Sequence, residues 1–256
     1  MEIMHGYYRK MDHIGECNME YNPQKSVWFN SNIEYLFNVE LTEFDLKDAG
    51  YNLIKEYKLL PSEEIERLSK MDKGVKRHIE IGMIQKNNPE FSKKLQEKFA
   101  DMRYIFINSN NLKDDDIVSV KKDALFIIGQ VKNKKFGKLE FRQKNVYSSY
   151  LRFPNIQNLE IYWNNIQPDI KGMTEHAINR HRLYMYNFIN EMIKLIENNS
   201  PSVKRKMLKF ISDYKYNLLD EGYYLEFNRK STDINPIFNF KNIIVPLVQI
   251  ITKEVS

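Results

Sequence analysis

The sequence predicts an α+β protein, because strand-forming and helix-forming patterns occur in separate blocks along the chain. Branched and aromatic residues that partly alternate with polar ones predict strands at 33–47, 116–127, 135–153 and 158–163. Apolar residues at helical spacing predict two long helices between 61 and 110 and a helical tail from Thr174. The chain has 256 residues, which is enough for one or two domains with a hydrophobic core.

The composition is that of an ordinary water-soluble protein, with 42% hydrophobic and 29% charged residues. No apolar run reaches the roughly 18 residues that a membrane-spanning helix needs, so no membrane partner is expected. The N-terminus has scattered charges and no apolar core, which excludes a secretory signal and favours a cytoplasmic protein. A single cysteine, Cys17, excludes an internal disulfide, and a formal net charge of +5 permits a polyanionic partner.

The first strand, at 33–47, leads through a turn into a short helix at 48–60. Ser62, with acidic residues directly after it, is the expected N-cap of a helix that continues to Asn88. Pro89 then begins another helix with an apolar face. Because only a short turn joins these two helices, we expect them to form an antiparallel hairpin.

Two aspartates mark the ends of predicted strands. Asp45 comes near the end of the strand at 33–47, and Asp123 lies at the tip of the hairpin at 116–127. Two carboxylates on adjacent strand ends are suited to hold two Mg²⁺ ions about 3.5–4 Å apart. We therefore expect both side chains to lie together on one antiparallel sheet as ligands of Mg²⁺ or Mn²⁺. The alternative is that Asp123 serves only the chemistry of its turn.

Cationic and polar side chains lie between the two aspartates in the sequence. Lys73, Lys76, Arg77 and Gln85 belong to the helical segment, and Lys73 and Arg77 are spaced to share one helix face. Cations aimed at a two-metal site would neutralise and position a triphosphate. The competing interpretation is that these are ordinary solvated charges on a helix surface.

The order of these features resembles the polymerase core of the family B (Pol α-like) DNA polymerases, in a reduced form. "FDLKDAGYN" is similar to the family's motif A, with Asp45 at the metal-binding position. "KGVKRHIEIGMIQKN" is similar to the fingers helix, with Lys76 or Arg77 as the residue that contacts triphosphate. "VSVKKDALFI" is similar to motif C, with Asp123 at its second aspartate.

Two further motifs follow in the family's order. "RQKNVYSSY" resembles the motif that grips the primer–template, through Lys144 and Tyr147. "PDIKGM" resembles a motif that contacts the duplex near the thumb, through Lys171 and Gly172. The resemblance covers roughly 33–175 and implies an antiparallel palm-like sheet, a helical-hairpin fingers insertion and a helical C-terminal thumb. The implied segments are an N-terminal segment with the first palm strands at 1–60, fingers at 61–110, palm at 111–172 and a thumb-like region at 173–256.

The resemblance implies template-dependent nucleotidyl transfer, with a primer–template nucleic acid and a dNTP as partners. Asp45 and Asp123 would bind the metal, and Lys76 or Arg77 would stabilise the leaving pyrophosphate. Tyr51 would pack beneath the incoming sugar, while Lys73 and Gln85 are further nucleotide contacts. By analogy, such a reduced core suggests a virus or mobile element, and for a virus the cytoplasm would be that of a host cell.

Two departures from the family pattern keep other hypotheses open. Lys121 replaces the first aspartate of motif C, and the fingers helix lacks the family's K-x-x-x-N-S-x-Y-G pattern. These changes favour a polymerase-derived module that has lost catalysis and binds nucleic acid or protein. A third hypothesis is one subunit of a split polymerase, whose remaining domains belong to another polymerase subunit or replication protein.

Overall fold

The computed structural model describes residues 7–10, 21–22, 24–153, 159–171, 191–198 and 200–219. The chain is α+β, as the sequence predicts, and its assigned strand pairs are antiparallel. It divides into two compact units. Unit 1 comprises Met1–Met11, Asn32–Glu40 and Tyr147–Ser256, and unit 2 comprises Asp12–Ser31 and Leu41–Val146. The strands β3 (Ile33–Leu46) and β7 (Leu139–Phe153) therefore each contribute to both units.

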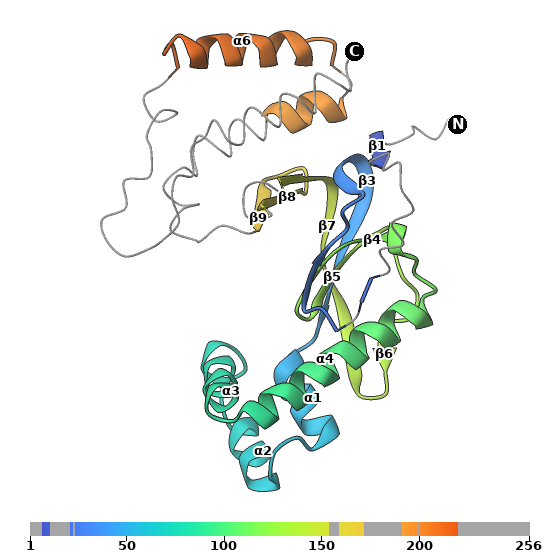
Figure 1. The fold of residues 1–256 in the computed structure, drawn as a ribbon, viewed down its shortest axis with the longest axis vertical. Coiled ribbons are helices and arrows are strands. Elements are labelled where there is room, and N and C mark those ends of the chain that lie inside the picture. Colours follow the sequence, from blue (N-terminus) through green and yellow to red (C-terminus); the bar gives the residue numbers. More distant parts are fainter. Residues whose placement is uncertain are drawn as a thin grey trace. The chain divides into compact units, whose positions relative to one another are not determined.

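The sheet of unit 2 has the strand order β2-β4-β5-β3-β7, with β6 paired to the start of β7 (Figure 1). Its shorter strands are β2 (Val27–Phe29), β4 (Ile117–Lys121), β5 (Ala124–Ile128) and β6 (Lys135–Phe136). The hairpin predicted at 116–127 is confirmed, since Lys121 pairs with Ala124 across a two-residue turn. Lys122 in this turn has a φ of 54°, the left-handed conformation that tight turns use.

The described residues of unit 2 include four α-helices, α1 (Ala49–Tyr57), α2 (Ser62–Ser69), α3 (Val75–Asn87) and α4 (Pro89–Ser109), and a short 3-10 helix, η1 (Asp114–Asp116). The single helix expected from Ser62 to Asn88 is wrong, because the chain breaks between α2 and α3. Gly74 there has a φ of 139°, which a helix does not permit.

The predicted N-cap at Ser62 is also wrong: Ser62 is the first helical residue, and its neighbour Pro61 takes the cap position without a side-chain hydrogen bond. Asn88 does form the junction between the two long helices. Its side chain accepts a hydrogen bond of 3.0 Å from the backbone N–H of Phe91 and so caps α4, which contacts α3.

Aromatic side chains fasten α4 to the sheet of unit 2. The ring of Phe106 lies 5.5 Å from that of Phe44 in β3 and 4.4 Å from that of Phe141 in β7. All three side chains are buried. Burying a side chain of this size contributes about 1.5–3 kcal/mol, so α4 provides a firm base for the strands that carry Asp45 and the Asp123 turn.

In unit 1, β1 (Tyr7–Lys10) pairs with the first half of β3. The second half of β7 pairs with β8 (Leu159–Trp163), which pairs with β9 (Pro168–Lys171). Helical structure is present at 191–197 and in α6 (Val203–Lys215), in agreement with a helical tail over those residues. The remainder of the predicted thumb-like region at 173–256 lies outside the described residues.

Candidate functional site

The structure brings Asp45 and Asp123 together in unit 2. Asp45 in β3 pairs with Ala124 in β5, the residue directly after Asp123. The backbone N–H of Leu46 donates to the carbonyl of Asp123 at 3.3 Å, which fixes the hairpin turn beside the end of β3. The carboxyl group of Asp45 lies near enough to Asp123 to raise its pKa. Their positions at the ends of neighbouring antiparallel strands are those that the sequence predicts.

The environment of Asp123 opposes its negative charge. Burial, and then the charge of Asp45, raise the pKa of Asp123 from 3.8 to about 6. The hydrogen bond between the two carboxyl groups acts in the same direction, whereas its own backbone N–H and the charge of Lys144 oppose the rise. The negative charge of Asp123 is therefore unfavourable beside Asp45 in this partly buried place, and a bound divalent cation would reduce the repulsion between the two carboxylates.

The turn that carries Asp123 is held from three directions. Arg103 of α4 is 2% exposed and donates from Nη1 to the carbonyl of Lys122 at 2.6 Å. The backbone N–H of Lys122 donates to the carbonyl of Ser26, just before β2. Together with the bond from Leu46, these contacts leave the turn little freedom to move Asp123 away from Asp45.

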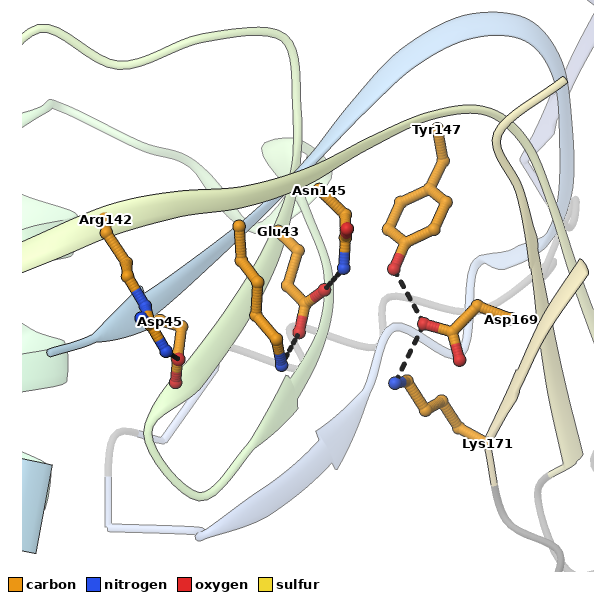
Figure 2. A network of polar contacts seen from close by, with 8 residues as sticks. Glu43, Asp45, Arg142, Asn145, Tyr147, Asp169 and Lys171 are labelled. Carbon is orange, nitrogen blue, oxygen red and sulfur yellow. Dashed lines mark hydrogen bonds and ion pairs between the residues drawn. The ribbon is translucent and has the colours of Figure 1, made fainter. Parts of the chain in front are cut away.

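Strand β7 supplies two cations and an amide to the same part of unit 2 (Figure 2). Arg142 Nη2 lies 3.0 Å from Asp45 Oδ2, and Lys144 Nζ lies 3.0 Å from Glu43 Oε1. Asn145 donates from Nδ2 to Glu43 Oε2 at 2.6 Å. Glu43 is only 1% exposed, so its charge depends on these two partners. Lys144, predicted to contact nucleic acid, therefore also stabilises a buried carboxylate.

Glu43, Arg142 and Arg103 are further residues of this site that were not predicted from the sequence. Glu43 and Asp45 are two residues apart in one strand, as are Arg142 and Lys144 in another, and this spacing places each pair on one face. That alternation of opposite charges was the available signal. No sequence pattern indicated that Arg103 is buried, because an arginine in an amphipathic helix is usually exposed.

Arg77 and Tyr51 do not lie as expected for nucleotide contacts. Arg77 is 2% exposed: its guanidinium donates to Asp48 Oδ2 at 2.8 Å and to the carbonyl of Met71 at 2.6 Å. It also lies 4.3 Å from the centre of the Tyr51 ring, which is itself 7% exposed. The expected cationic helix face is wrong at Arg77, because Asp48 and Tyr51 draw the side chain inward. Neither residue is available to a nucleotide in this structure.

The remaining predicted triphosphate contacts differ in exposure. Lys76 is on α3 and is exposed, and Gln85, on the same helix, is half-buried. Lys73 is exposed but precedes α3, so it does not share a helix face with Arg77 as expected. Of the two cations predicted to contact the triphosphate, Lys76 is therefore the exposed one.

The other predicted nucleic-acid contacts form a separate group in unit 1. Tyr147 of β7 is 2% exposed and donates from its hydroxyl to Asp169 Oδ2 at 2.7 Å. Lys171 Nζ lies 2.9 Å from the same oxygen (Figure 2). Lys171 remains about one-third exposed, so Tyr147 and Asp169 support it at the surface of β9. Gly172 lies outside the described residues.

A metal ion at the Asp45–Asp123 pair would take few ligands from this chain. Among the described side chains, no group of three or more His, Cys, Asp or Glu gathers in a way that would hold a metal ion. Mg²⁺ commonly binds through one or two carboxylates, with water and substrate phosphates completing its shell. The carboxylate pair fits this type of site.

Among the helices that the structure describes, none combines the length and the apolar character of a membrane-spanning segment.

Comparison with known proteins identifies a family for the chain. The family described as Bacteriophage PBS1 gene 130 protein matches residues 19–255, and the chain belongs to this family. No curated protein matches the sequence.

Proposed function

We propose that this member of the phage family is a reduced DNA polymerase core that catalyses template-dependent nucleotidyl transfer with Mg²⁺ or Mn²⁺. The observation that carries the proposal is the carboxylate pair of Asp45 and Asp123 at adjacent strand ends. The chain order supports it: a strand with Asp45, then helices, then a hairpin with Asp123 at its tip. This is the order that the family B resemblance implies.

Two features of the carboxylate pair support binding of a divalent cation. Its two negative charges lie close together, and burial with mutual repulsion raises the pKa of Asp123. A bound cation would remove this repulsion and keep both groups ionised. When bound, such ions lower the pKa of an attacking hydroxyl and stabilise the charge on the transferred phosphoryl group.

We assign the contacts with the nucleotide to residues of α3 and of the turn before it. Of the two candidate cations in α3, Lys76 is exposed and Arg77 is buried, so we assign the contact with the leaving pyrophosphate to Lys76. Arg77 acts indirectly, because it ties α3 to Asp48 at the start of α1, three residues after Asp45. Lys73 and Gln85 remain secondary candidates for the nucleotide.

We assign the contacts with nucleic acid to exposed cations on β7 and β9. Lys144 is 44% exposed on its side chain, and Lys171 is 32% exposed. Both would bind the phosphate backbone without distinguishing sequence. Tyr147 is buried, so its contribution is to hold Asp169, which in turn orients Lys171.

A second candidate is a module that binds nucleic acid or protein without catalysis. Lys121 stands where the family has a further carboxylate, and Arg142 makes an ion pair with Asp45. Both features reduce the negative charge available to a metal. A subunit of a split polymerase would differ from this module by becoming active once its partner chain is added. The viral setting that the resemblance suggests agrees with the phage name of the family.

The proposal is tested by extension of a labelled primer on defined templates with Mg²⁺ or Mn²⁺. We expect incorporation that requires metal and follows the template base. Addition of nucleotides regardless of template would replace the polymerase proposal by terminal transfer. A protein that binds duplex but is inactive with every metal and template would support the non-catalytic module, unless a partner chain restores activity.

A further inference from the structure

Two ion pairs link β7 to β3 on one face of unit 2, and they differ in how firmly they are held. Glu43 has a side chain that is 2% exposed and receives both Lys144 and Asn145. Asp45 is 14% exposed, and Arg142 reaches it with Nη2 from a side chain that is 55% exposed (Figure 2). Glu43 is buried and depends on its partners for its charge, whereas Asp45 is more exposed and the half-exposed Arg142 is able to leave it for solvent.

A divalent cation at the carboxylate pair would compete directly with Arg142. The guanidinium does not deprotonate, so it cannot adapt to a neighbouring metal by losing its charge. A half-exposed ion pair of this kind contributes little free energy, whereas a divalent cation would interact with Asp45 and Asp123 together. The cation would therefore displace Arg142 from Asp45 and leave its long side chain on the same exposed face.

An arginine that is released from Asp45 is well suited to bind a phosphate group. Its planar guanidinium binds phosphate oxygens with two parallel hydrogen bonds, a geometry that it does not use on Asp45, where Nη2 alone makes the contact. The neighbouring cation on this face, Lys144, is paired with Glu43 rather than with the proposed metal ligands, so a cation at Asp45 and Asp123 would not change its pairing. Arg142 is thus the side chain beside the carboxylate pair whose charge becomes available when a metal arrives.

We propose that Arg142 is an exchangeable counter-ion: it neutralises Asp45 in the metal-free protein and binds a phosphate of the nucleic acid when a divalent cation takes Asp45. This inference rests on the proposed function, because it assumes that Asp45 and Asp123 bind the cation. Since coupling between two ligands is reciprocal, phosphate binding by Arg142 must strengthen cation binding by the same factor.

The test uses the full chain and two probes, Mn²⁺ and a short labelled DNA duplex. Free Mn²⁺ is followed by electron paramagnetic resonance, and duplex binding by fluorescence anisotropy with and without Mn²⁺ at constant ionic strength. The variant is Arg142→Gln. The matched control is Lys138→Gln, which removes one positive charge from a side chain that is 85% exposed and paired with Glu56. Thermal melting verifies that both variants are folded.

We expect Arg142→Gln to bind Mn²⁺ more tightly than wild type in the absence of DNA, by about two- to fivefold, the range that a half-exposed ion pair allows. The same variant should lose the gain in duplex affinity that Mn²⁺ gives the wild type, and Lys138→Gln should retain it. Weaker or unchanged Mn²⁺ binding by Arg142→Gln, or an unchanged gain in duplex affinity, would overturn the inference.

One further variant separates failure of the inference from failure of the proposed function. Asp123→Asn should abolish Mn²⁺ binding if the carboxylate pair is the metal site. If wild type binds Mn²⁺ and Asp123→Asn does not, an unaltered Arg142→Gln refutes only the counter-ion role. If wild type does not bind Mn²⁺ at all, or binds it equally without Asp123, the proposed function and the inference both fail.

Discussion

Replacing Asp123 with asparagine should make the protein more stable near neutral pH, although the residue lies at the centre of the proposed site. The structure holds Asp123 against Asp45 in a partly buried turn. Asparagine has nearly the same shape, keeps an oxygen for the backbone N–H, and donates a hydrogen bond to Asp45 instead of repelling it. Asp123→Asn therefore removes the unfavourable charge and leaves the turn intact.

The magnitude follows from the pKa. Asp123 has a pKa of about 6 in the folded chain against an ordinary value of 3.8. Because the folded value is raised, the folded protein keeps a proton that the unfolded chain releases, so stability is greatest below about pH 4 and falls as pH rises through about 6. The difference of about two pH units corresponds to at most about 3 kcal/mol above pH 7. We expect Asp123→Asn to gain about 1–3 kcal/mol there and roughly half as much at about pH 5.

The assay is chemical denaturation of wild type and Asp123→Asn at several pH values without divalent cations. Asp101→Asn is the matched control, because Asp101 forms only a surface ion pair with Lys98 and should change stability by less than about 1 kcal/mol. Mg²⁺ should stabilise wild type and reduce its difference from the variant. Equal or lower stability of Asp123→Asn above pH 7 would refute the claim that the two carboxylates repel each other.

Three further changes test neighbouring contacts. Arg103→Met should lower the free energy of unfolding by about 1–3 kcal/mol, because it leaves the carbonyl of Lys122 without its buried donor; chemical denaturation measures this. Lys144→Ala should destabilise by about 2 kcal/mol, because Glu43 loses a charged partner, and adding Glu43→Gln should recover most of the loss. Lys171→Ala should weaken duplex binding equally for all sequences and lower the salt dependence by about one counterion, as measured by fluorescence anisotropy.

The sequence predicted the elements that carry the two aspartates. A strand at 33–47 and a hairpin at 116–127 both have strong local patterns, and the apolar residues on either side of the turn predict Asp123 at its tip. That β3 and β5 are neighbours did not follow from local pattern. It was expected from the order of motifs that resemble the family B polymerases, and the pairing of Asp45 with Ala124 agrees with it.

The contacts around the pair were beyond the reach of sequence patterns. Alternation shows which face a strand residue occupies, but it does not give the register that sets Arg142 beside Asp45. The burial of Arg77 could not be predicted from local pattern either, because its partners Asp48 and Tyr51 belong to another part of the chain. Charged residues on an amphipathic helix are ordinarily solvated, and only the tertiary contacts reveal the exception.

The central claim is that Asp45 and Asp123 hold the divalent cations of a nucleotidyl transfer reaction. The most direct measurement is the rate of single-nucleotide addition to a labelled primer–template, compared between wild type and Asp45→Asn with saturating Mn²⁺. Because metal stabilisation of the transition state supplies several kcal/mol, we expect the rate of addition by Asp45→Asn to fall by several orders of magnitude while its duplex affinity is unchanged. Addition at an equal rate by wild type and Asp45→Asn would contradict it.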